Sequence, residues 1–145
     1  MNNIFKIILS LILIINLSNN SFAKESFFDE ALKFYNDKKY EKAKFLFERS
    51  IAYNPKDSNS YLYLAKIYNH KDDEKNEEKN LETTLLIEPN NEEAILMSMK
   101  VALNKTNYSK VKDFSERFKK VCKKLCDKSD KILNELANLE PKNES

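Results

Sequence analysis

The feature that most constrains the fold of this 145-residue chain is an internal repeat with a period of 34 residues. When the sequence is shifted by 34 positions against itself, residues of like size and polarity meet. The matched pairs are Phe27 and Tyr61, Ala31 and Ala65, Phe34 and Tyr68, Phe47 and Leu81, Ile51 and Leu85, and Pro55 and Pro89. A second step of 34 brings Ile95, Met99 and Ala102 into line with the second unit. Such self-similarity predicts stacked structural units that share one continuous core.

The composition indicates that these units are helical. The chain contains no glycine and only three prolines. A β-rich or α/β fold of this size normally needs glycines for its turns. The absence of glycine also excludes the glycine-rich phosphate loop and the dinucleotide-binding fingerprint, which need close backbone approach. The net charge of +2 is too balanced to make nucleic acid the expected partner.

Hydrophobic periodicity places the helices along the chain. Apolar residues recur three, four and seven positions apart, as on the buried face of a helix. Pro55 and Pro89 follow two of these stretches and end them, because proline cannot continue a helix. The predicted helices span residues 25–37, 40–53, 58–70, 74–87, 91–104 and 108–121, and a further apolar stripe at 129–139 predicts a capping helix.

These residues resemble the tetratricopeptide-repeat motif, a pair of antiparallel helices with small residues where the helices touch. The first-helix motif reads Tyr61, Leu64-Ala65, Tyr68 in the second unit and Phe27, Ala31, Phe34 in the first, with Glu30 at the usual large apolar position. The second-helix motif reads Ala43, Phe47, Pro55. The resemblance implies an all-α, right-handed α-solenoid spanning residues 24–140. Its parts would be three helix-turn-helix units (about 24–57, 58–91 and 92–125) and a cap at 127–139, and a tail at 141–145 would follow it.

One residue departs from the pattern. Glu77 falls where the first unit has Ala43 and the third has Val111, and a carboxylate facing the partner helix carries a desolvation cost. We therefore expect that the second helix of this unit is rotated or frayed, or that the repeat register slips. The polar run 71–80 favours a mobile segment there.

The N-terminus has the features of a secretory signal. Lys6 precedes an apolar run from Ile7 to Ile15, and Ser21-Phe22-Ala23 offers small residues at the positions that signal peptidase reads. The run is shorter than the ~20 residues needed to span a bilayer. We predict a signal peptide at 1–23 that is cleaved before Lys24, with an uncleaved membrane anchor as the alternative. The Lys, Asn and Ile bias suits an AT-rich bacterial genome, which favours the periplasm.

Export changes the interpretation of the two cysteines. Outside a reducing cytosol, Cys122 and Cys126 favour a disulfide, which would pin the cap to the array. Two free buried thiols, or a redox or metal site, are the alternatives. The spacing is not C-x-x-C, and the single histidine, His70, is distant in sequence, so the last alternative has little support.

The resemblance also implies where a partner binds. In this family the first helices of successive units line the concave face, and residues outside the packing motif contact the ligand. By phase these are Phe28, Leu32, Tyr35, Asn36, Leu62, Tyr63, Lys66, Asn69, Leu96, Met97, Lys100 and Leu103. Most are apolar, and exposed apolar patches mark binding sites. The family's clamp for a C-terminal carboxylate is not reproduced, so the expected ligand is an apolar or amphipathic segment. The alternative is that the cap helix or a second copy fills the groove.

The sequence offers no catalytic constellation. The chain has one histidine and no glycine, so a Ser-His-Asp or histidine-metal site could draw on only one imidazole, and we predict neither enzymatic activity nor a cofactor. The expected function is an exported protein-interaction module, an envelope adaptor or assembly factor. The alternative is a self-associating structural protein, because residues 72–93 carry a net charge of −7 and residues 100–131 a net charge of +7.

Overall fold

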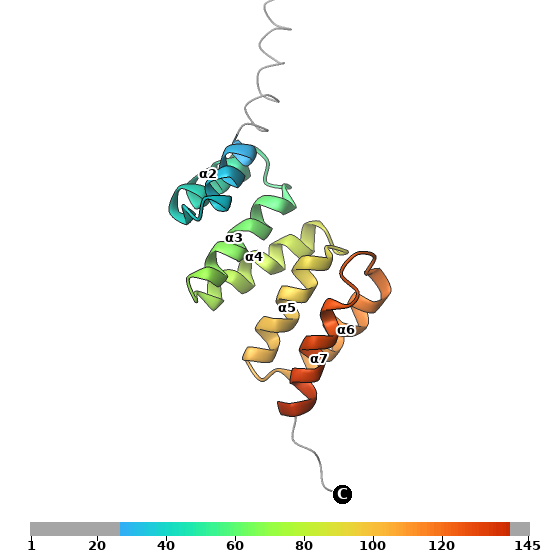
Figure 1. Cartoon of the computed structure of the whole chain (residues 1–145). Helices are drawn as coiled ribbons and strands as arrows, with labels where there is room; N and C mark the ends of the chain where they lie inside the picture. Colours follow the sequence, from blue (N-terminus) through green and yellow to red (C-terminus); the bar gives the residue numbers. More distant parts are fainter. Residues whose placement is uncertain (1–26, 140–145) are drawn as a thin grey trace, which may run out of the picture. The chain divides into compact units, whose positions relative to one another are not determined.

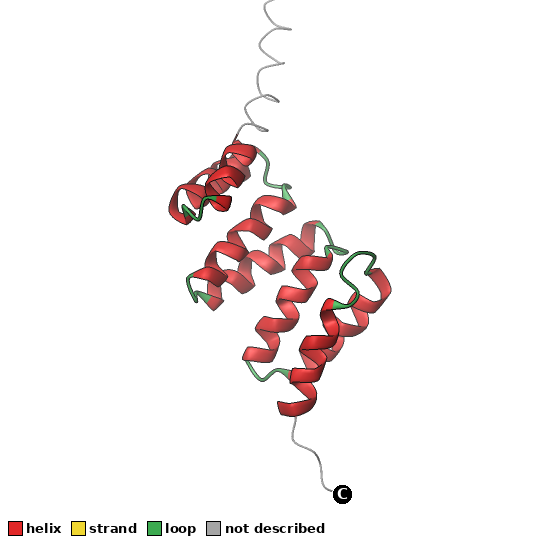
Figure 2. Cartoon of the chain, viewed as in Figure 1, coloured by secondary structure: helices red, strands yellow, loops and turns green. Residues whose placement is uncertain are grey.

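The computed structural model of the chain describes residues 27–139, and within that range the regular structure is entirely helical (Figures 1 and 2). Residues 27–36 are helical and are followed by six labelled helices. These are α2 (Tyr40–Tyr53), α3 (Ser58–His70), α4 (Glu74–Ile87), α5 (Glu92–Asn104), α6 (Tyr108–Val121) and α7 (Lys128–Leu139). The predicted signal peptide at 1–23 and the tail at 141–145 lie outside the described residues.

The helix bounds repeat with the period of the sequence. Helices α2, α4 and α6 have 14 residues each and begin at Tyr40, Glu74 and Tyr108, in steps of 34. The turn before each contains a non-glycine residue in the left-handed region, and these residues follow the same period. They are Lys38 (φ 59°), Asp72 (φ 55°) and Thr106 (φ 53°). A chain without glycine thus accepts a backbone conformation that costs an ordinary residue about 1–2 kcal/mol in order to reverse direction.

Side-chain caps hold the helix starts in the later units. Asp73, Asn91 and Asn107 accept hydrogen bonds from backbone N–H groups at the starts of α4, α5 and α6, respectively. Each such cap satisfies an otherwise unpaired donor in the first turn and stabilises its helix by about 1 kcal/mol. In this chain without glycine, the short polar residues at the turns therefore serve as helix caps.

The described chain divides into two compact units between Ser60 and Tyr61. In the first unit, the helix at 27–36 packs on α2, and Ala31 and Ala43 are both fully buried. The rings of Phe28 and Phe47 lie 5.6 Å apart at this contact. Small residues let the helix backbones approach, and the aromatic rings fill the space beside them.

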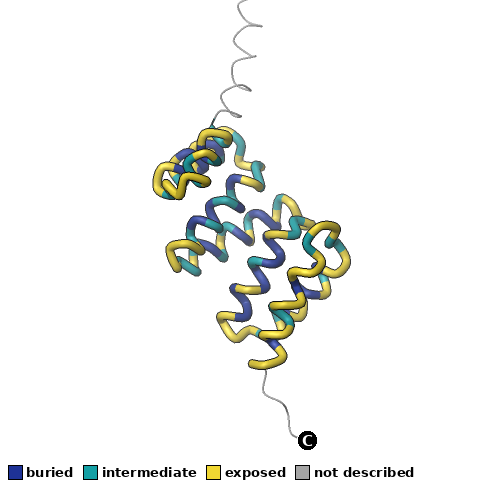
Figure 3. The backbone as a smooth tube through the Cα atoms, viewed as in Figure 1, coloured by how far each residue is buried: buried dark blue, intermediate teal, exposed yellow. Residues whose placement is uncertain are grey.

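The second unit is built around α5, which is buried along most of its length (Figure 3). Helices α4, α6 and α7 all pack against it. Its Ile95 and Met99 are fully buried and join Phe118 of α6 and Leu136 of α7 in one hydrophobic cluster. The end helix α7 therefore caps this core, as a terminal element of a repeat array must.

The departure at Glu77 does not disturb the repeat. Helix α4 is neither frayed nor shifted, because it begins at Glu74, 34 residues after the start of α2. Glu77 occupies the buried position expected from its register, with 5% of its surface exposed. The expectation of a rotated helix or a slipped register is therefore wrong. The buried carboxylate is tolerated at this position because the Asn69 side-chain amide donates to both of its oxygens, at 3.1 Å each.

Candidate functional site

The candidate binding residues of the first unit are partly covered by their own helix pair. Phe28 packs on Phe47, and the ring of Tyr35 lies 5.6 Å from that of Tyr40. Leu32 is half-buried, and Asn36 is exposed at the end of the helix. The first unit therefore presents a mixed polar and aromatic strip at these positions.

On α3 the candidate residues form polar contacts within the second unit. The ammonium group of Lys66 lies 4.4 Å from the ring centroid of Tyr63, which is half-buried, and 2.9 Å from a carboxylate oxygen of Glu93 on α5. Asn69 is exposed overall, although its amide hydrogen-bonds Glu77. A partner that contacts α3 at these positions would meet the half-buried Tyr63 ring and these polar groups.

Three of the candidate leucines are not exposed, contrary to the expectation. The exposed fractions of Leu62, Leu96 and Leu103 are 4%, 9% and 5%, and all three belong to the core cluster. The repeat phase places them on the face expected to bind a partner, but other side chains of the core cluster cover them there. On α5 the solvent-facing candidates are Met97, which is half-buried, and Lys100, which is exposed.

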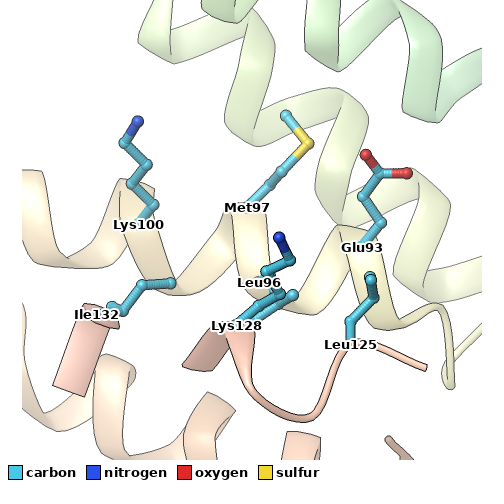
Figure 4. A pocket seen from close by; sticks show the side chains of 7 residues that line it. All are labelled: Glu93, Leu96, Met97, Lys100, Leu125, Lys128 and Ile132. Atoms are coloured by element: carbon cyan, nitrogen blue, oxygen red, sulfur yellow. The ribbon is translucent and has the colours of Figure 1, made fainter. Parts of the chain in front are cut away.

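A pocket of about 320 Å³ lies between α5 and the C-terminal segment (Figure 4). Glu93, Met97 and Lys100 follow one another along α5, and Leu125, Lys128 and Ile132 face them from the other side (Figure 4). Leu96 completes the lining. The pocket therefore combines three predicted site residues, namely Leu96, Met97 and Lys100, with residues of the cap that the sequence did not assign to the site.

The two glutamates at the start of α5, near this pocket, already have partners within the second unit. Glu93 is paired with Lys66 at 2.9 Å. The adjacent Glu92 accepts hydrogen bonds from the backbone N–H groups of Lys124 and Leu125, at 3.0 and 2.9 Å, and these bonds lower the pKa of its carboxyl group. Both acids are thus committed to internal partners.

The two cysteines close the loop that carries Leu125. The sulfur atoms of Cys122 and Cys126 lie at disulfide distance, with Cα atoms 5.3 Å apart. The loop is held by the Cys122–Cys126 pair at its ends and by Glu92 at its centre. The sequence did not predict the role of Glu92, because a carboxylate that binds backbone amides 32 and 33 residues away leaves no periodic signal.

A second charged cluster links α4 to the turn before α6 and to α6 itself. Glu78 accepts from Lys105 and, at 2.9 Å, from Lys110, and Lys105 also lies 3.4 Å from Glu74. These lysines lower the pKa of Glu78, and Glu78 raises that of Lys105. Part of the acidic stretch 72–93 is therefore neutralised by part of the basic stretch 100–131 inside the second unit.

Within residues 27–139, no three His, Cys, Asp or Glu side chains gather in a group that would hold a metal ion. None of the helices in that range is long and apolar enough to cross a membrane.

Comparison with known proteins identifies the repeat. Residues 46–79, one full period of 34, match the sequence profile described as "Tetratricopeptide repeat". No curated protein matches the chain.

Solved structures with the same fold are tetratricopeptide-repeat domains and chaperones. The TPR2B domain of yeast Sti1, in complex with pHsp70, superposes with a TM-score of 0.74 at 11% identity. The match covers 81% of this chain and 98% of that one. The Yersinia enterocolitica type III secretion chaperone SycD, in complex with a peptide of the translocator YopD, gives a TM-score of 0.69 at 14% identity and covers 79% and 89%. The Arabidopsis OM64 TPR domain gives 0.69 at 18% identity and covers 79% and 97%. These likenesses establish an all-α solenoid fold of helix-turn-helix repeats.

Proposed function

Since the chain is a tetratricopeptide-repeat protein, by its matching repeat and its fold, we propose that it is an exported interaction module that holds an apolar or amphipathic segment of another protein. The observation that carries the proposal is the face of α3 and α5 that bears Tyr63 and Met97. Both side chains are half-buried; Met97 lines a pocket with an apolar lining, and Tyr63 lies under the ammonium group of Lys66, which pairs with Glu93 of that lining. Half-buried apolar side chains beside such a pocket are typical of peptide-binding surfaces. Two structural relatives support this proposal: SycD is in complex with a peptide of the translocator YopD, and the first TPR of Spaghetti (RPAP3) is bound to an HSP90 peptide.

The proposal predicts that charge introduced on this face abolishes partner capture without unfolding the chain. Tyr63→Glu and Met97→Glu place carboxylates where an apolar segment would pack, and burying an unpaired charge costs several kcal/mol. Photo-reactive residues at Tyr63 and Met97, followed by mass spectrometry, should identify one recurrent partner segment. Tyr63→Glu should reduce the crosslink formed from position 97 at least tenfold, and Met97→Glu should do the same to the crosslink formed from position 63.

Leu86→Glu is the matched control. Leu86 lies on α4, is 82% exposed and does not line the pocket between α5 and the C-terminal segment. The control variant should retain full capture and the same helical circular dichroism signal. If the two groove variants capture the partner as well as the Leu86 variant does, this face is not the binding site. If only the chain's own peptides are crosslinked, self-association replaces the proposal.

The location of this activity follows from the N-terminal sequence. We propose that residues 1–23 direct export to the periplasm and are removed. Mass spectrometry of the protein from cells should then give a chain that begins at Lys24, recovered in the osmotic-shock fraction. A protein that keeps Met1 and stays with the membrane pellet would mean an uncleaved anchor facing the periplasm.

A further inference from the structure

The pocket between α5 and α7 has an apolar base. Its lining includes Leu96, Met97, Leu125 and Ile132, and Leu96 and Leu125 are held in place by the core cluster and by the Cys122–Cys126 loop. With a volume of about 320 Å³ it lies at the small end of the range for ligand sites, about 300–1,000 Å³. A space of this size accommodates one or two apolar side chains of an extended or helical segment.

The rim of this pocket is positive. Lys100 and Lys128 line it from opposite sides (Figure 4). Among the described residues, neither lysine has a carboxylate at ion-pair distance. Burial raises the pKa of Glu77, and the more distant charge of Lys100 only opposes that rise. The one acid in the lining, Glu93, already has Lys66 at 2.9 Å. A ligand in the pocket therefore meets two ammonium groups that have no carboxylate partner in the described chain and one carboxylate whose charge is already balanced by Lys66.

We infer that this pocket selects the partner: it takes an apolar side chain that is flanked by carboxylates on the partner segment. The inference rests on the proposed function and narrows it from any apolar or amphipathic segment to an acidic one. Charge complementarity with the two lysines sets the orientation of the partner segment and discriminates against basic segments. The apolar base of the pocket supplies the area that the segment buries. The carboxylates need not be those of a chain end, since Lys100 and Lys128 stand on different helices on either side of the apolar base.

Methionine methyl resonances provide a direct probe of this pocket. The chain has three methionines, of which Met97 lines the pocket and Met99 is fully buried in the core two residues away. The full chain, labelled with ¹³C at the methionine methyl groups, is titrated with three synthetic peptides. The first has a central leucine flanked by glutamates, the second has lysines in place of the glutamates, and the third has serine in place of the leucine.

The expected result is a saturable shift of the Met97 methyl signal with the acidic leucine peptide only, while Met99 stays in place. Lys100→Gln combined with Lys128→Gln should weaken this binding by about five- to tenfold, because two partly exposed charge contacts are lost. Lys119→Gln combined with Lys120→Gln is the matched control, since it removes the same charge from exposed positions on α6 outside the pocket. The control variant should bind as the unaltered chain does.

Several results would overturn the inference. Equal binding of the lysine peptide, or an equal loss of affinity in both double variants, would show that the rim does not select for acid. A Met97 signal that moves with protein concentration, without peptide, would assign the pocket to a second copy. Failure of the proposed function gives a different result. If the partner crosslink at Tyr63 survives the Lys100 and Lys128 changes, only the inference about the pocket is wrong. If the unaltered chain gives no partner crosslink at Tyr63, the proposed function itself is wrong.

Discussion

Phe118→Ala is expected to lower the free energy of unfolding of the second unit by about 3–5 kcal/mol, the usual cost of removing a buried ring. Phe118 is fully buried in the cluster that joins α5, α6 and α7. Its removal leaves a cavity under the helix that carries the charged contacts to α4. Single domains are stable by only about 5–15 kcal/mol, so the loss takes a large part of the total.

Urea unfolding followed by circular dichroism measures this change. The midpoint should fall with little change in slope, because the surface exposed on unfolding is nearly the same. Leu86→Ala provides the control: Leu86 is 82% exposed, and its truncation should alter stability by less than about 0.5 kcal/mol. Equal effects of the two changes would mean that α6 does not seal the core of this unit.

The sequence predicted the helices well because the repeat makes every signal occur more than once. The bounds of α2, α3, α4 and α6 agree with the predicted ranges, and α5 and the cap agree to within one residue. The proline stops at Pro55 and Pro89 and the repeating aromatic positions each fix a helix relative to the next. When local chemistry and long-range packing both support the same helices, the sequence leaves few alternative folds.

The candidate site was less predictable, because repeat phase does not reveal what covers a face. Leu96 and Leu103 have the phase of exposed residues, yet the core of the second unit buries them. Likewise, the charge runs gave no sign that Glu78 pairs with Lys105 and Lys110, since these contacts join residues 27 and 32 positions apart. Both features depend on tertiary packing, which a single-helix pattern does not encode.

Asn69→Ala is expected to cost about 2 kcal/mol at neutral pH, although Asn69 is an exposed residue near the end of α3. Its amide is the donor that satisfies both oxygens of the buried Glu77 carboxylate, at 3.1 Å each. Removal of one partner leaves a buried acceptor unsatisfied, which costs about 1–3 kcal/mol and more when the acceptor is charged. An exposed asparagine without such a partner would cost less than about 0.5 kcal/mol.

The cost should depend on pH in a defined direction. Burial raises the pKa of Glu77, and the hydrogen bond from Asn69 opposes that rise. The folded chain therefore binds this proton more tightly than the unfolded chain. Glu77 favours folding most below the ordinary glutamate pKa, and this contribution is lost as pH rises through the raised value. Without Asn69 the pKa rises further, so the destabilisation should be largest at neutral pH and shrink in mildly acidic buffer.

A double-mutant cycle with Glu77→Ala isolates this interaction. Alanine is the residue that the first unit has at the equivalent position, Ala43, which is fully buried between its helices. In the Glu77→Ala background, Asn69→Ala should change stability by less than about 0.5 kcal/mol, because no buried carboxylate remains to be satisfied. A coupling near 2 kcal/mol at neutral pH would show that Asn69 is held by Glu77 to preserve the fold of this unit. No coupling would mean that water satisfies Glu77 and that Asn69 is free to contact a partner, as the repeat phase predicted.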